Sequence, residues 1–227
     1  MNLNSHDEGA LSGLGKTVLE TLVAFALSSC LSQSTYQALV WLAWGDSYTI
    51  GEGVAVHERW PEQVAAQDTQ RWQIEYTART GWTSSDLLKA LASKNYPPAS
   101  ANRISLLIGV NNQYRGLSPD DFRHDFIQLL TLAIQTSRTG SQGVLVLTIP
   151  DYGVTPFGQR LPGTTINLAQ FNSVIKEECQ KHGIQVVDIT PLSLRAATEP
   201  NLTARDGLHP SGEQYRLWAE MVRVQLK

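Results

Sequence analysis

Along the chain, short apolar runs alternate with stretches in which apolar residues recur at helical spacing. The runs predict five strands, over residues 38–45, 72–78, 103–109, 143–150 and 184–189. The first run, "ALVWLAWG", is apolar throughout and does not alternate with polar residues. Continuous apolar runs are typical of parallel strands whose two faces are both buried.

Cap residues mark the helices between these runs. Ser118 and Pro119 suit the start of a helix over 118–137, which has acidic residues in its first turn. Ser211 and Gln214 predict a capping box at the start of the last helix. Further helices are expected from Pro61 to about residue 67, from a cap near Thr83, and over 165–183, where Gly183 ends the helix.

This alternation of strands and helices predicts an α/β fold, with a five-stranded parallel sheet between two layers of helices. In such sheets the functional residues gather at the carboxyl ends of the strands. We therefore expect the loops that begin at Gly45, Ala78, Gly109 and Pro150 to lie along one edge of the sheet. A functional site is expected at that edge.

The composition narrows the classes of function. The chain has 227 residues, 42% of them hydrophobic and 17% charged, which suits one large folded domain with a sizeable core. A net charge of -3 disfavours nucleic-acid binding, because no excess of basic residues attracts phosphates. Cys30 and Cys179 form no CxxC pair, so neither a disulfide framework nor a zinc site is expected. No other metal or cofactor is predicted.

The first 37 residues differ from the rest and form an N-terminal extension. Its apolar run "LVAFALSSC", over 22–30, is too short to span a membrane but resembles the middle of an export signal, with Lys16 before it. The last four residues of that run resemble a bacterial lipoprotein box, which makes Cys30 a candidate lipid anchor. Three acidic residues near the run fit a signal poorly, and a surface helix is the alternative. We favour an exported lipoprotein, with a cytoplasmic protein as the alternative.

Ser47 directly follows the first predicted strand, in the stretch "WLAWGDSYTIGEGV". A serine hydroxyl becomes a good nucleophile only when a base takes its proton. Asp206 and His209 could supply that base, because a short Asp-x-x-His turn can hold the Nδ1–H of the ring and leave Nε2 free to accept a proton. The alternative is an ordinary turn before the last helix. The other histidines, at 6, 57, 124 and 182, are expected to be surface or structural residues.

An ester hydrolase also needs hydrogen-bond donors for the oxyanion that forms during the reaction. Gly81 follows the second predicted strand, where a glycine lets its backbone N–H approach a ligand closely. Asn111 and Asn112 follow the third, where a side-chain amide could be aimed at the same place. The alternatives are a turn glycine and asparagines that bond to their own turn.

Four short blocks of this sequence resemble the SGNH, or GDSL, hydrolase family. Gly45-Asp46-Ser47, Gly81, Gly109-x-Asn111 and Asp206-x-x-His209 occur in that family's order and spacing, and the likeness covers about residues 39–225. The resemblance implies a flavodoxin-like three-layer α/β/α sandwich over 38–227 that hydrolyses carboxylic esters. It also implies roles for the matching residues: Ser47 as nucleophile, His209 as base, Asp206 as its orienting acid, and Ser47, Gly81 and Asn111 as the oxyanion hole.

The sequence departs from the family pattern at two positions. Tyr48 stands where the first block usually has leucine, and we expect the aromatic ring to pack there. Asn112 stands where the third block usually has aspartate, and we expect altered hydrogen bonding with the same reaction. By the same pattern, Asp46 is expected to brace the turn before the serine.

Substrate choice is less strongly indicated. Asn112, Tyr114, Tyr152 and Phe157 are candidates to line the substrate pocket, although the aromatic rings could instead pack the loops onto the sheet. The sequence has no long insertion that could form a lid over the site, and this favours short acyl or acetyl esters, including those of sugars, as substrates.

Other functions are also compatible with these residues. A long-chain lipase, a thioesterase or an acyltransferase could use the same residues. A carbohydrate-binding or adhesion module and a flavodoxin-type cofactor module are the non-hydrolase alternatives. The oligomeric state is not indicated.

Overall fold

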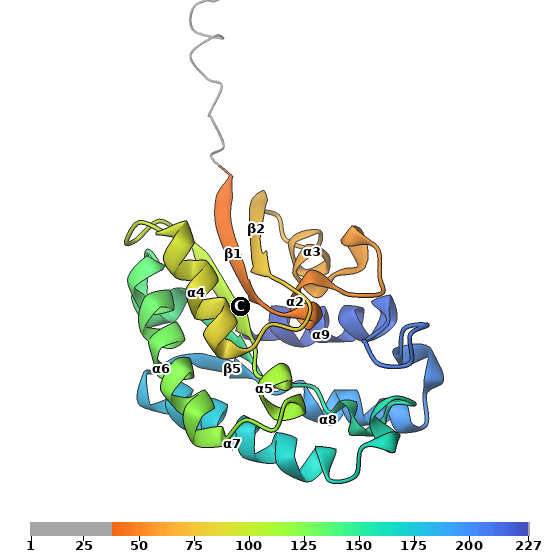
Figure 1. Ribbon diagram of the computed structural model, residues 1–227. Helices are drawn as coiled ribbons and strands as arrows, with labels where there is room; N and C mark the ends of the chain where they lie inside the picture. Colours follow the sequence, from red (N-terminus) through yellow and green to blue (C-terminus); the bar gives the residue numbers. More distant parts are fainter. Residues whose placement is uncertain (1–37, 227) are drawn as a thin grey trace, which may run out of the picture. The chain divides into compact units, whose positions relative to one another are not determined.

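Five parallel strands form a single sheet in the computed structural model, which describes residues 38–226. In spatial order the strands are β2 (Trp72–Ala78), β1 (Leu39–Gly45), β3 (Arg103–Leu107), β4 (Val144–Leu147) and β5 (Gln185–Val187) (Figure 1). The first strand, β1, therefore lies inside the sheet, with β2 on one side and β3, β4 and β5 on the other. The predicted parallel sheet is confirmed.

Helices cover both faces of the sheet. On one face α4 (Ser84–Lys94) packs beside α6 (Pro119–Thr136), which packs beside α7 (Thr164–Lys181). On the other face α3 (Trp60–Ala65) packs against α9 (Gly212–Gln225), and Figure 1 shows these two groups on opposite sides of the strands. This is the predicted flavodoxin-like three-layer sandwich. No helix within residues 38–226 is long and apolar enough to cross a membrane.

The predicted helix starts are present, with one difference. Thr83 caps α4 through a reciprocal pair of hydrogen bonds with Asp86, and the Ser118 hydroxyl caps α6. At α9 the Ser211 hydroxyl accepts from the Gln214 N–H, but the returning half of the predicted capping box is missing. The reason is that the Ser211 N–H already donates to the carbonyl of Leu202.

Three strands end earlier than their apolar runs predicted. In β4 the ladder stops at Leu147, and the backbone N–H and carbonyl of Ile149 bond instead to the side-chain amide of Asn172, at 2.7 and 2.9 Å. Ile149 is therefore buried with its polar groups satisfied outside the sheet. A hydrophobic run in the sequence cannot show whether a buried residue belongs to the strand or lies beyond its end.

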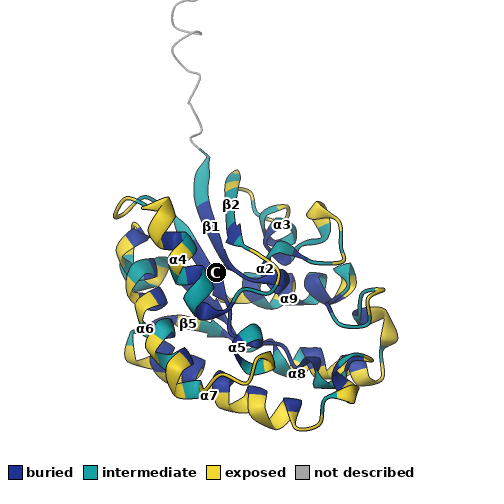
Figure 2. Cartoon of the chain, viewed as in Figure 1, coloured by how far each residue is buried: buried dark blue, intermediate teal, exposed yellow. Residues whose placement is uncertain are grey.

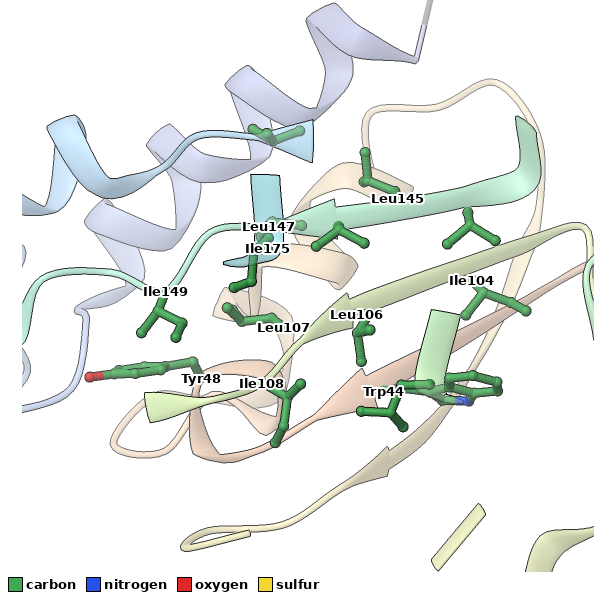
Figure 3. Close-up of a cluster of buried hydrophobic side chains, with 14 of the residues drawn as sticks. Trp44, Tyr48, Ile104, Leu106, Leu107, Ile108, Leu145, Leu147, Ile149 and Ile175 are labelled. Atoms are coloured by element: carbon green, nitrogen blue, oxygen red, sulfur yellow. The ribbon is translucent and has the colours of Figure 1, made fainter. Parts of the chain in front are cut away.

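The core lies between the sheet and its helices. Figure 2 shows the central strands β1, β3 and β4 and the inward helix faces mostly buried, and the outer strand β2 mostly intermediate, with many exposed residues on the outer faces of the helices. In Figure 3, Ile104 and Leu106 of β3 and Leu145 of β4 pack on the central strands, while Tyr48 and Ile149 lie near the carboxyl ends of the strands. A close-packed core of this kind holds that edge rigidly.

Residues 1–37 lie outside the described part of the chain. The extension, its export signal and the candidate lipid anchor at Cys30 therefore stay predictions.

Candidate active site

The carboxyl ends of three neighbouring strands meet at one edge of the sheet. Gly45 is aligned with Ala78 of β2 on one side and with Leu107 of β3 on the other. The loops that follow these strands therefore begin side by side, as the sequence predicted, and they carry Ser47, Gly81 and Asn111.

Ser47 is the first residue of the short helix α2 (Ser47–Ile50), and only 5% of it is exposed. The Asp46 carboxylate braces this turn by accepting a hydrogen bond from the Tyr48 N–H at 3.0 Å. Gly45 is required by close packing, because a β-carbon there would lie 2.1 Å from Thr49 Oγ1 and 2.3 Å from the Leu107 carbonyl oxygen. The Gly-Asp-Ser stretch thus forms a tight turn from strand to helix.

Asp206 and His209 form the turn that the sequence predicted. One carboxylate oxygen lies 2.7 Å from His209 Nδ1, and the other accepts the backbone N–H groups of Leu208 and His209. Partial burial alone would raise the pKa of Asp206, but these hydrogen bonds lower it below its ordinary value. A carboxylate at Nδ1 fixes the proton on that nitrogen and leaves Nε2 as the acceptor.

Ser47 and His209 line the same pocket, together with Gly81 and Asn111. The pocket has a volume of about 190 Å³. The hydrogen bonds among residues 38–226 do not include one from the Ser47 hydroxyl to the His209 ring. Such a bond is often long before substrate binds and tightens in the complex. The His209 ring meets Tyr48 in a T-shaped arrangement with ring centres 5.7 Å apart, so Tyr48 packs at its position as expected.

Gly81 and Asn111 approach the pocket from two loops. Gly81 has a φ of +83°, a conformation that favours glycine, in the loop between β2 and α4. Asn111 belongs to α5 (Val110–Tyr114), and its Nδ2 donates one hydrogen to the Trp82 carbonyl at 2.9 Å. An amide nitrogen carries two hydrogens, so the side chain is held in place while its second N–H stays free to donate.

Asn112 does not line this pocket, although the sequence made it a candidate. Its side chain is buried and bonds twice to Ser84: Oδ1 accepts the Ser84 N–H at 2.9 Å, and Nδ2 donates to the Ser84 hydroxyl at 2.7 Å. The Ser84 hydroxyl in turn donates to Asp125 on α6 at 2.7 Å. Asn112 therefore joins α5 to the start of α4.

The three candidate aromatic residues, Tyr114, Tyr152 and Phe157, all line the pocket. Tyr114 and Phe157 have ring centres 6.1 Å apart, and Tyr114 is 54% exposed. Tyr152 is buried, and its hydroxyl donates to Gln113 Oε1 at 2.8 Å, which joins the loop after β4 to α5. These rings both line the pocket and pack the loops together.

Sequence reasoning missed four further residues of the pocket wall, namely Tyr48, Thr80, Val110 and Leu208. Each of the four is adjacent in the sequence to a motif residue that the sequence had predicted to be in the site. Within 38–226 there is no group of three or more His, Cys, Asp or Glu side chains that could hold a metal ion. Of the other histidines described, His57 and His124 are exposed, and His182 bonds to the Glu178 carbonyl.

The fold resembles that of several solved esterases. A lipolytic protein of the G-D-S-L family from Veillonella parvula is 18% identical, with a TM-score of 0.66 over 82% of this chain and 96% of that one. A lipase/acylhydrolase from Enterococcus faecalis is 20% identical, with a TM-score of 0.65 over 83% and 95%. Axe2, an acetylxylan esterase from Geobacillus stearothermophilus, is 17% identical, with a TM-score of 0.66 over 83% and 94%.

No curated protein sequence matches the chain significantly. The model of the GDSL-like lipase/acylhydrolase family, in contrast, matches residues 43–217, which include the Gly-Asp-Ser turn, the Gly81 loop, α5 and the Asp206–His209 turn. Since the match spans most of the chain and all the loops of this pocket, the chain belongs to the GDSL-like lipase/acylhydrolase family and is a hydrolase of carboxylic esters.

Proposed function

We propose that this protein hydrolyses short-chain acyl esters through a covalent intermediate on Ser47. The observation that carries the proposal is the shared pocket: a serine, a histidine already oriented by a carboxylate, and two candidate oxyanion donors line one hollow, although they come from distant parts of the sequence. A nucleophile, a base and its orienting group in one site are the parts that acyl transfer needs.

In the proposed reaction, His209 Nε2 takes the Ser47 proton as the serine oxygen attacks the ester carbonyl. The negative oxygen of the tetrahedral intermediate accepts hydrogen bonds from the Ser47 and Gly81 N–H groups and from Asn111 Nδ2. His209 then gives its proton to the departing alcohol, which leaves an acyl-serine. In the second half of the reaction, His209 takes a proton from water as the water oxygen attacks the acyl carbonyl. The bond between the serine oxygen and the acyl group then breaks, His209 returns the proton to the serine oxygen, and the acid is released.

The pocket supports a small substrate. Its volume of about 190 Å³ is below the range of roughly 300 to 1,000 Å³ that is typical of drug-sized ligand sites. Its walls are mostly apolar and include the aromatic rings of Tyr114, Tyr152 and Phe157. An acetyl or other short acyl group therefore suits it, with the alcohol extending toward the exposed Tyr114. The structural likeness to an acetylxylan esterase supports acetylated sugars as one class of substrate.

Substitution of the serine tests the proposal. We expect Ser47→Ala to lower kcat for a p-nitrophenyl acyl ester by at least about 10³-fold, because the nucleophile is lost. Ser173→Ala, an exposed serine on α7, is the matched control and should leave kcat unchanged. Circular dichroism and the melting temperature show whether both variants fold. Turnover by folded Ser47→Ala at the wild-type rate would contradict the proposal.

The chain-length preference is tested separately, with p-nitrophenyl esters of two to sixteen carbons and with acetylated xylose. We expect kcat/KM to be highest for the two- to four-carbon esters. A maximum at twelve or more carbons would retain the serine mechanism but would overturn the short-chain preference.

A further inference from the structure

Three consecutive residues of the Gly81 loop are each held by a side chain from another segment of the chain. The Thr80 hydroxyl donates to Glu52, which follows α2. The Gly81 carbonyl accepts from Arg115 Nη2 at 2.6 Å, and the Trp82 carbonyl accepts from Asn111 Nδ2 at 2.9 Å. Of these side chains, only Asn111 has an expected role in the reaction.

We propose that Arg115 is a positioning residue that holds the Gly81 N–H in the direction required for oxyanion binding. This inference rests on the proposed function of the Ser47 site and adds a residue that none of the sequence motifs contains. Arg115 acts through the backbone of Gly81 and does not touch the substrate, since it is not among the residues that line the pocket.

The position of Arg115 suits this role. It caps the carboxyl end of α5, where its N–H donates to the Asn111 carbonyl, so one short helix carries both Asn111 and Arg115. Its Nη1 lies 3.9 Å from the carboxylate of Asp86, which itself caps α4. The guanidinium thus lies between the Gly81 carbonyl and a fixed carboxylate.

Gly81 needs an external restraint because of its own conformational freedom. At a φ of +83°, a glycine can rotate its neighbouring peptide groups with little steric cost, and such a rotation turns the N–H away from the pocket. No side chain on residue 81 can block that rotation. The N–H belongs to the peptide group before Gly81 and the carbonyl to the group after it. The charged bond from Arg115 fixes the group after Gly81, and the bond from Thr80 to Glu52 holds the residue before it, so a movement of the glycine that turns its N–H would strain one of these two bonds.

The direction of the N–H affects the transition state more than the bound ester. An oxyanion donor interacts weakly with the neutral carbonyl of the substrate and strongly with the charged oxygen that forms later. Loss of the restraint should therefore lower kcat and leave KM nearly unchanged. A residue that binds substrate directly would instead change KM.

The test compares Arg115→Ala and Arg115→Lys with Arg138→Ala, a matched control on the opposite edge of the sheet. We expect Arg115→Ala to lower kcat about 10- to 100-fold, less than the 10²- to 10³-fold typical of removing an oxyanion donor. KM should change less than threefold. Arg115→Lys can still donate to the Gly81 carbonyl and should recover part of kcat, while Arg138→Ala should match the wild type.

A second readout separates positioning from a general structural effect. A short-chain trifluoromethyl ketone forms a tetrahedral adduct with the serine and mimics the oxyanion, so its affinity should fall in parallel with kcat in Arg115→Ala. The affinity for the product acid should stay constant. If Arg115→Ala does not fold, as judged by circular dichroism, Arg115→Gln replaces it in the same measurements.

Two outcomes would overturn the inference: kcat equal to wild type in folded Arg115→Ala, or a rise in KM with kcat unchanged. The proposed function is judged apart from it, by Ser47→Ala. If that variant is inactive while Arg115→Ala is fully active, only the role of Arg115 fails. If folded Ser47→Ala is active, the proposed function fails, and with it the basis for this inference.

Discussion

Two of the loops that line the Ser47 pocket, the Asp206–His209 turn and the Gly81 loop, are held in different ways. In the Asp206–His209 turn, the Asp206 carboxylate satisfies two backbone N–H groups and the histidine ring within four residues. A backbone bond from Ala204 to the His209 carbonyl, at 2.7 Å, closes the same turn. The Gly81 loop has one local backbone bond, from the Trp82 N–H to the Arg79 carbonyl, but the side chains that hold it come from elsewhere in the chain, namely from Glu52, Asn111 and Arg115.

This difference determines what each loop depends on. The Asp206 carboxylate orients the histidine from within the turn, and the contacts from outside are a backbone bond from the Phe157 N–H to the Gly207 carbonyl, at 2.9 Å, and the packing of the His209 ring on Tyr48. The geometry of the Gly81 loop depends on how three other segments pack against it. We therefore expect substitutions in the Asp206–His209 turn to affect mainly the chemistry, and substitutions around the Gly81 loop to affect stability and catalysis together.

The largest effect on kcat should come from substitutions in the Asp206–His209 turn. His209→Ala removes the base and should lower kcat by about as much as Ser47→Ala, because members of one catalytic unit are strongly non-additive. Asp206→Asn should cost less, about 10²- to 10⁴-fold in kcat, since Asn Oδ1 still accepts the two backbone N–H groups while Nδ2 favours the wrong tautomer of His209.

Steady-state kinetics and thermal melting check this pair of variants. Because Asn Oδ1 still accepts the two backbone N–H groups, we expect the melting temperature of Asp206→Asn to fall only slightly, by the part of the stabilisation that the charged bond to His209 supplies. Activity of that variant within threefold of the wild type would show that the Asp206 carboxylate does not orient the base.

The same contrast explains how much the sequence could predict. The Asp-x-x-His turn was predicted because the contacts of the Asp206 carboxylate lie within four residues, and Ser47 because it directly follows an apolar run. The Arg115 contact with Gly81 spans 34 positions, and no local pattern indicates it. The fold follows the same rule: apolar runs predicted the five strands, but their ends depend on distant partners such as Asn172, 23 positions from Ile149.

Two aspartates of the site should respond to pH in opposite directions. Hydrogen bonds lower the pKa of Asp206, so its stabilising effect is present above the ordinary pKa and is lost as the pH falls through the lowered value. Asp46 is fully buried, and burial raises its pKa to about 7 from an ordinary 3.8. Its Oδ2 has no hydrogen-bond partner within the described residues.

For Asp46 the folded state binds the proton more tightly, so the free energy of unfolding should fall as the pH rises from about 4 to about 7 and then level off. Asp46→Asn removes this titration. Its stability relative to the wild type should rise between pH 5 and pH 8 by of the order of 3 kcal/mol, from urea unfolding at both values. Parallel stability curves for the two proteins would contradict the raised pKa.

The smallest effect should appear at Asn112, and it tests directly whether the start of α4 is held from outside. The Ser84 hydroxyl has one hydrogen, which it donates to Asp125, and it accepts from Asn112 Nδ2. Asn112→Asp introduces the aspartate that is usual in the family but places two carboxylates around that single hydrogen. One of them then lacks a donor, and we expect a loss of about 1 to 2 kcal/mol in the free energy of unfolding.

A second substitution should reverse that loss. In Asn112→Asp with Asp125→Asn, the new amide donates to the Ser84 hydroxyl and the hydroxyl donates to the new carboxylate, so every partner is again satisfied. Urea unfolding of the four proteins in a double-mutant cycle should therefore give a favourable interaction of about 1 kcal/mol between the two positions. Additive losses would mean that Ser84 does not connect α5 to α6, and that the start of α4 next to the Gly81 loop is held by its own cap alone.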